Sequence, residues 1–147
     1  MKRVKGFNEE GIEYEELVNA NDYQRFIDVA FKYADSIVLT YNKSKEKFDK
    51  SIWSFLNSSI IDMEETKETA VTIGPKVLLL YFKLDKTTKD WLRNKDNIYD
   101  FPQNGKEWLD DLCFIKNGEI VFASCTHERF NFMNQELSNL FLKYHQA

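Results

Sequence analysis

The sequence feature that most constrains the fold is an Asn-Gly dipeptide, Asn117-Gly118, between two apolar runs. The first run is Leu112–Lys116 and the second is Glu119–Ala123. Asn-Gly is the favoured pair for a two-residue type I′ turn, because both positions tolerate a positive φ. The two runs are therefore predicted to form an antiparallel β-hairpin, and any fold for this chain has to contain an antiparallel sheet.

The turn also predicts which side chains of the hairpin meet. A two-residue turn pairs Lys116 with Glu119, Phe114 with Val121, and Leu112 with Ala123. In this register Asp110, Cys125 and His127 share one face at the open end of the hairpin. Cys113 and Cys125 are expected on opposite faces, so a disulfide between them is not expected.

Asp110, Cys125 and His127 bring a carboxylate, a thiol and an imidazole to one place. Such a set could provide the orienting group, nucleophile and base of a cysteine-dependent enzyme, or the ligands of a metal ion. Cysteine is, however, among the most buried residue types and usually acts as a small apolar side chain, and the spacings of the two His and two Cys match no zinc signature. We therefore expect a structural role here, with no catalytic residues, no metal site and no cofactor. The enzyme or ligand-binding domain built on these three residues is kept as the alternative.

Periodicity predicts the other elements. Helices are expected from an N-cap at Asn21 or Asp22 to about Ala34, from Ser44, from Thr87 or Thr88, and from about Phe130 to Tyr144. Strands are expected over Ser36–Tyr41, Met63–Ile73 and Val77–Leu84, with Gly74-Pro75 as the break between the last two. The nearly continuous apolar run Val77–Leu84 is expected to be a central strand, buried on both faces.

The composition agrees with long regular elements. Only 5 Gly and 2 Pro occur in 147 residues, which argues against a turn-rich sandwich or barrel. A hydrophobic share of 43% with a net charge of -4 excludes a disordered chain. We predict one α+β domain over residues 1–147, with a mainly antiparallel sheet of about five strands and three to four helices packed on it. Residues 1–19 are acidic and weakly patterned, and are predicted to be a loosely attached lead-in.

The ends and cysteines of the sequence indicate a soluble cytoplasmic protein. The basic start is followed by Gly6–Glu10 instead of the apolar core of a signal peptide. The longest apolar stretch, Val77–Phe82, is too short to cross a bilayer. Two cysteines without a secretion signal are expected to stay reduced in the cytoplasm. A membrane partner is therefore not expected.

Acidic residues gather in clusters, and two of these predict a binding surface. The predicted partner-binding residues are Glu64, Glu65, Glu68, Trp108, Asp110 and Asp111. An acidic patch with an aromatic anchor suits a basic protein partner, because charge steers the encounter and the aromatic ring supplies contact area. The alternative is an ordinary solvated surface. Nucleic acid is not an expected partner, because the net charge is negative and acids interrupt the basic stretch Lys83–Lys95.

The second half of the chain resembles a known class of small bacterial proteins. The residues that carry the resemblance are Trp108–Phe114, Asn117-Gly118 and Cys125–Glu128, with Thr72–Pro75 before a hydrophobic strand. They are similar to a pattern in immunity proteins of polymorphic-toxin systems. The resemblance implies a non-enzymatic protein that binds and neutralises a cognate toxin by masking its active site. It carries over no contact residues, because immunity surfaces are specific to each pair.

Overall fold

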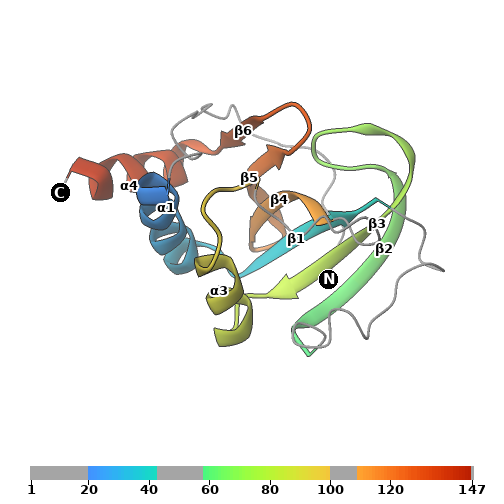
Figure 1. The fold of residues 1–147 in the computed structure, drawn as a ribbon, viewed down its shortest axis with the longest axis horizontal. Coiled ribbons are helices and arrows are strands. Elements are labelled where there is room, and N and C mark those ends of the chain that lie inside the picture. The colour runs from blue at the N-terminus through green and yellow to red at the C-terminus, as the bar shows by residue number, and fades with distance from the viewer. Residues whose placement is uncertain (1–19, 43–57, 100–108, 147) are drawn as a thin grey trace.

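The computed structural model describes residues 20–42, 58–99 and 109–146. Its strands form one six-stranded sheet in the order β2-β3-β1-β4-β5-β6 (Figure 1), and every neighbouring pair is antiparallel. The elements are α1 (Ala20–Tyr33), β1 (Ser36–Tyr41), β2 (Ile60–Glu68), β3 (Ile73–Lys83), α3 (Lys86–Arg93), β4 (Leu109–Lys116), β5 (Glu119–Cys125), β6 (Phe130–Met133) and α4 (Gln135–Gln146). The predicted α+β class with a mainly antiparallel sheet is confirmed.

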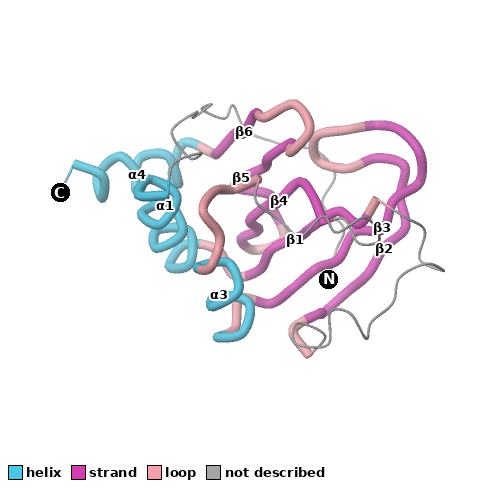
Figure 2. The backbone as a smooth tube through the Cα atoms, in the orientation of Figure 1, coloured by secondary structure: helices cyan, strands magenta, loops and turns pink. Residues whose placement is uncertain are grey.

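The described helices pack on one face of the sheet (Figure 2). Phe26 of α1 lies at the centre of this core, with ring centroids 5.7 Å from Phe114, 4.7 Å from Phe122 and 6.0 Å from Phe141. Tyr23 is also fully buried and satisfies its hydroxyl by donating to a backbone carbonyl of α3 at 2.6 Å. Aromatic side chains at helical spacing thus join α1 to two central strands and to α4.

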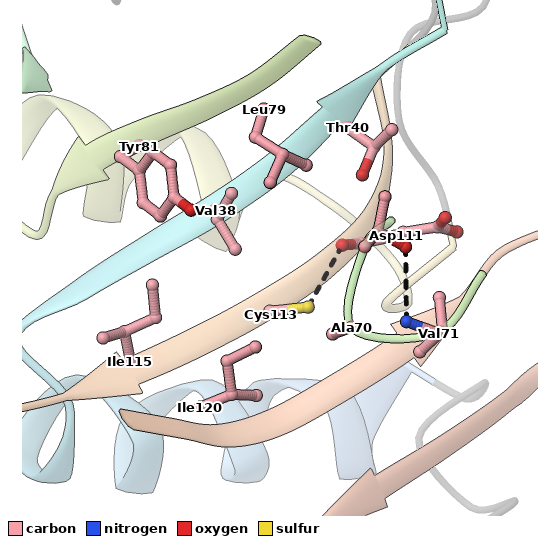
Figure 3. Close-up of a pocket in the computed structure, with 11 residues that line it drawn as sticks. Val38, Thr40, Ala70, Val71, Leu79, Tyr81, Asp111, Cys113, Ile115 and Ile120 are labelled. Carbon is pink, nitrogen blue, oxygen red and sulfur yellow. Dashed lines mark hydrogen bonds between the residues drawn. The ribbon is translucent and has the colours of Figure 1, made fainter. Parts of the chain in front are cut away.

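The opposite face of the sheet carries a smaller apolar cluster. Its buried members are Val38, Leu79, Tyr81, Cys113, Ile115, Ile120 and Ala123. The tip of the β2–β3 hairpin lies across this cluster through Ala70 and Val71 (Figure 3). The cavity left between the tip and the sheet is only about 10 Å³, so the tip fits closely. Asp111 and Cys113 of β4 line this cavity, so the second face of the sheet includes one of the acidic residues discussed below.

Helices α1 and α3 lie where the sequence predicted them, but their predicted first residues are not correct. Helix α1 begins at Ala20, so Asn21 and Asp22 lie inside it and neither is the N-cap that we predicted. Helix α3 is capped by Asp85, whose Oδ1 accepts the Thr88 N–H at 3.0 Å. The predicted start at Thr87 or Thr88 lies slightly too late, because the Asp85 carboxylate caps the helix and Lys86 is its first residue. The helix predicted from Ser44 lies outside the described residues.

The strand predictions differ from the structure at the turn between β2 and β3. Strand β1 has the predicted bounds, and Leu78–Phe82 of β3 are buried as predicted, although β3 is second from the edge of the sheet. The turn before β3 lies at residues 69–72, where Thr69 Oγ1 accepts the Val71 and Thr72 N–H groups at 3.2 and 3.0 Å. Gly74-Pro75 is therefore not the break but part of β3.

The predicted C-terminal helix starts too early. Phe130–Met133 forms strand β6 against β5, and helix α4 begins after it. Asn134 marks the boundary, because its Oδ1 accepts the Leu137 N–H at 2.8 Å in the manner of an N-cap. Spacing alone misled the prediction, since Phe130 and Met133 are three residues apart and suit a helix as well as a strand.

The β4–β5 hairpin forms with its predicted turn but not its predicted register. Asn117 and Gly118 have φ of 52° and 82°, and Lys116 pairs with Glu119. Beyond Ile115 the register shifts, so that Phe114 pairs with Phe122 and Cys113 with Ala123. The predicted pairs Phe114–Val121 and Leu112–Ala123 are wrong, because a β-bulge directs both Val121 and Phe122 into the helix-side core.

The bulge also changes where the cysteines point. Ala123 shares the Cys113 face of the sheet, and strand alternation puts Cys125, two residues further on, on that face too. The prediction of opposite faces for Cys113 and Cys125 is therefore wrong. Both are nevertheless buried free thiols.

Candidate functional site

A second bulge, in β4, positions the two predicted acidic residues of that strand. Val38 of β1 pairs with Cys113 and Thr40 with Asp110, so one β1 residue faces both Asp111 and Leu112. Asp111 takes a φ of 58° at this bulge, a conformation that aspartate tolerates better than most residues. Asp110 and Asp111 are consequently both buried. We call Asp110, Asp111, Asn42, Thr126 and His127 the carboxylate corner.

Asp110 and His127 meet in the carboxylate corner, as the sequence predicted. The distance from His127 Nε2 to Asp110 Oδ2 is 3.6 Å, with 65% of the His127 side chain exposed but only 1% of the Asp110 side chain. The Asn42 amide also donates to Asp110 Oδ2. A buried carboxylate beside an exposed imidazole can orient that imidazole, as in the acid–base pairs of enzymes.

Asp111 forms a reciprocal connection with the end of β5. Its Oδ1 accepts the Thr126 N–H at 2.8 Å, and its own N–H donates to Thr126 Oγ1 at 3.1 Å. Burial raises the pKa of Asp111 to about 6, and the Asp110 charge adds to this, while the Thr126 N–H and the charge of His127 act against it. The ionised carboxylate is therefore costly to the fold near neutral pH.

Cys125 is close to His127 in sequence, but its thiol is buried. Burial raises its pKa, and hydrogen bonds from the backbone N–H groups of Glu128 and His127 offset this only in part. Burial likewise raises the pKa of Cys113 to about 12. A nucleophilic cysteine needs a lowered pKa and access to solvent. Cys125, the last residue of β5, has neither property in this structure.

The predicted partner-binding residues separate into two regions. Glu65 and Glu68 are exposed on β2 and Glu64 is half-buried there, whereas Asp110 and Asp111 are buried in β4. The expectation that Asp110 would be exposed together with Glu64–Glu68 is wrong, because β3 and β1 lie between the two strands. Trp108 lies outside the described residues.

Strand β2 therefore carries the acidic surface. We call Asp62, Glu64, Glu65 and Glu68 the acidic edge, because β2 is the first strand of the sheet and pairs with β3. The carboxylates occupy both faces of the strand. Asp62 and Glu64 lie opposite Tyr81 and Leu79 on the face of the smaller cluster, while Glu65 lies opposite Leu78 on the helix side.

Exposed apolar residues flank the acidic edge, and they were not among the residues predicted from the sequence. Ile61 of β2 is 46% exposed and Ile73 is 84% exposed. Ile73 pairs with Glu68 in the part of the hairpin that extends beyond β1, since β1 pairs only with Leu78–Lys83 of β3 (Figure 1). Gly74-Pro75 could have indicated from the sequence that this part of β3 is exposed. A proline has no backbone N–H to donate, so in a strand it occupies a position that has no neighbouring strand on its N–H side.

Metal sites, membrane spans and known relatives give no positive indication of function. Within the described ranges, no group of three or more His, Cys, Asp or Glu side chains suits a metal ion. No helix in those ranges is long and apolar enough to cross a membrane. Comparison of the chain with protein-family models, with characterised proteins and with solved structures found no match. The resemblance to immunity proteins stays a prediction.

Proposed function

We propose that the chain is a cytoplasmic protein-binding domain that acts as an immunity protein, neutralising a cognate bacterial toxin by masking its active site. The observation that supports this proposal is the acidic edge with exposed Ile61 and Ile73 beside it. Carboxylates accelerate the encounter with a basic partner and select against acidic ones, while exposed apolar side chains supply contact area. The partner is accordingly expected to present a basic surface.

An affinity pull-down from the native host tests this proposal, with mass spectrometry as the readout. The bait is compared with the variant E64Q/E65Q/E68Q and with the control D96N/E119Q/E136Q. Both variants remove three exposed or half-exposed carboxylates, but the control sites lie away from β2. A partner that binds the wild type and the control, but not the β2 variant, is the expected result.

The captured partner then has to behave as a toxin. Expressed alone it should arrest growth, and coexpression with the wild-type chain should restore growth while the β2 variant does not. Equal capture of the partner by all three baits would show that the acidic edge is not part of the interface. A captured protein without toxicity would reject the immunity function.

The competing hypothesis is a cysteine-dependent enzyme that uses Asp110, Cys125 and His127. A specific observation favours part of it, namely the contact between His127 and Asp110. The raised pKa of the buried Cys125 thiol supports the binding proposal instead. Alkylation with iodoacetamide near pH 7, followed by peptide mapping, should label Cys125 as slowly as Cys113. Fast labelling of Cys125 alone would favour the enzyme.

A further inference from the structure

We propose that the tip of the β2–β3 hairpin, residues 69–72, is a strap that closes over the second face of the sheet and opens as pH rises, because the Asp111 carboxylate lies beneath it. This device is independent of the proposed function, since it involves no partner. Three features of the molecule support it: the place of the tip, the way the tip is held, and the surroundings of the carboxylate.

The tip covers part of the smaller apolar cluster. Ala70 and Val71 pack against this cluster, and the cavity between them and the sheet is only about 10 Å³. Asp111 and Cys113 of β4 line the same cavity and are 7% and 3% exposed. In Figure 3 both lie under the loop that carries Ala70 and Val71. The closed tip therefore shields a carboxylate and a thiol from water.

Apolar contact holds the tip on the sheet. The hydrogen bonds of the tip lie within it: the Thr69 N–H donates to the Thr72 carbonyl at 2.9 Å, and Thr69 Oγ1 accepts the N–H groups of Val71 and Thr72. Within the part of the chain that the structure describes, no hydrogen bond joins residues 69–72 to β1, β4 or β5. Segments with few buried apolar contacts open locally at low free energy, well before the whole fold does.

The hairpin has an irregular stretch at which the tip can pivot. Thr66 of β2 pairs with Val77 of β3. The next pair, Glu68 with Ile73, follows a register shift that places residues 74–76 of β3 opposite residue 67 alone. Gly74-Pro75 lies in this stretch and is exposed, and its proline has no N–H to donate to a ladder. The tip can therefore lift without breaking the regular pairs next to β1.

Asp111 makes the closed arrangement sensitive to pH. An ionised carboxylate loses hydration where Ala70 and Val71 cover it. Burial accordingly raises the pKa of Asp111 to about 6. Opening of the tip admits water, so the pKa falls toward its ordinary value of 3.8. Because the pKa is higher in the closed state, closure is favoured at low pH and loses that advantage as pH rises through about 6.

The groups around Asp111 leave its own burial as the main influence on its charge. The charge of Asp110 disfavours ionisation, while the Thr126 N–H and the charge of His127 favour it. The thiols of Cys113 and Cys125 also face Asp111, and burial keeps both uncharged by raising their pKa. The polar side chains that β1, β3 and the tip add to the cavity carry no charge, and are Thr40, Tyr81 and Thr69.

The test measures how fast dithiodipyridine reaches Cys113 in the full chain, with peptide mapping to separate it from Cys125. Each rate is divided by the rate of the same thiol in the urea-unfolded chain at the same pH, which removes the pH dependence of the reaction itself. The corrected Cys113 rate should rise by about fivefold or more between about pH 4.5 and about pH 7.5. The upper limit is about a hundredfold, set by the difference between 3.8 and about 6.

Three variants separate the carboxylate from the apolar contact. Asp111→Asn should abolish the rise, because the amide stays neutral at every pH. Val71→Ala weakens the contact of the tip with the sheet, so it should raise the corrected rate by about threefold at every pH and keep the rise. Ile73→Ala is the matched control in the same hairpin, because Ile73 is 84% exposed, and it should behave as the wild type.

Cys125 is the internal control for unfolding of the whole domain, because it is buried but does not line the cavity under the tip. A parallel rise at Cys125 would assign the access to global unfolding and overturn the strap. A corrected Cys113 rate that is independent of pH in the wild type, or a rise that persists in Asp111→Asn, would also overturn it. So would a Val71→Ala variant that labels no faster than Ile73→Ala. None of these outcomes bears on the immunity function, which the pull-down tests separately.

Discussion

The carboxylates of β2 and those of β4 have the same chemistry but lie in opposite environments. On β2, Glu65 and Glu68 are exposed at the edge of the sheet. On β4, Asp110 and Asp111 are buried at a bulge, with hydrogen bonds from Asn42 and Thr126. Exposed carboxylates affect the fold little, whereas buried ones have to be satisfied internally.

This difference separates the acids that belong to the fold from those on which the binding proposal rests. Asp111 has two unfavourable features, a φ of 58° and a pKa raised by burial. Its two hydrogen bonds with Thr126 compensate by fixing the end of β5 against β4. The binding proposal therefore rests on β2 alone. Substitutions of the buried acids should mainly change the free energy of unfolding, and substitutions on β2 should mainly change association.

The largest effect is expected at Asp111. The substitution Asp111→Asn keeps a side-chain oxygen that can accept the Thr126 N–H, and asparagine tolerates a positive φ. Because the amide carries no charge, the substitution should stabilise the fold at pH 7. The increase of the Asp111 pKa from 3.8 to about 6 corresponds to about 3 kcal/mol as an upper value. Because the folded pKa is raised, the wild type loses stability as pH rises between about 4 and 6.

Urea unfolding of the wild type and Asp111→Asn at several pH values measures this effect. The two proteins should have similar stability near the unfolded pKa, about pH 4, and the variant should be more stable at about pH 7. The exposed Asp96→Asn is the matched control, and its difference from the wild type should not depend on pH. A variant less stable than the wild type at neutral pH would contradict the burial argument.

Asp85 is intermediate in burial between the β4 and the β2 carboxylates. The effect of pH on its contribution to stability is opposite to that of Asp111. Although burial alone would raise its pKa, hydrogen bonds from the Thr88 N–H and the Ser59 hydroxyl, with the charge of Lys83, lower it. Removing this N-cap by Asp85→Ala should cost about 1 kcal/mol. The contribution is present above the unfolded pKa and is lost as pH falls through the folded one, so the difference from the wild type should shrink below about pH 4. A loss of stability in Asp85→Ala that is the same at all pH values would contradict this prediction.

The sequence allowed the fold class and the β4–β5 turn to be predicted, because both depend on local signals. Asn117-Gly118 needs only its own two φ angles to form the turn. The bulges at Asp111 and Val121 depend instead on tertiary packing, since Val121 and Phe122 both enter the core under α1. No local pattern in the sequence distinguishes these bulges from a regular ladder.

The site could be predicted only in part, for the same reason. The predicted proximity of Asp110 and His127 is correct, although the register from which it was argued is changed by the bulges. The acidic run of β2 was recognised from composition. Whether an acid is exposed depends on the place of its strand in the sheet. That order, with β3 and β1 between β2 and β4, follows from long-range pairing that the sequence pattern does not specify.

On β2, neutral substitutions should affect association more than folding. The variant E64Q/E65Q/E68Q changes the net charge from -4 to -1, by three removed carboxylates, and should alter the free energy of unfolding by no more than about 0.5 kcal/mol per site. Like charges keep copies of an acidic surface apart by repulsion, so this variant should self-associate more readily at high concentration. Light scattering after size-exclusion chromatography would show this, with D96N/E119Q/E136Q as the equally neutralised control. Self-association of the control to the same extent would assign the effect to net charge and not to the edge.

The smallest effect is expected at His127, where the two environments meet. Its ring is largely exposed and lies 3.6 Å from the buried Asp110, and ion pairs with an exposed partner contribute little. His127→Gln should therefore change the free energy of unfolding by less than about 0.5 kcal/mol, and partner binding through β2 should be unchanged. Chemical denaturation and the pull-down measure the two quantities on the same variant. A loss of binding without a loss of stability would move the interface from the acidic edge to the carboxylate corner, because only a residue in direct contact with the partner could separate the two.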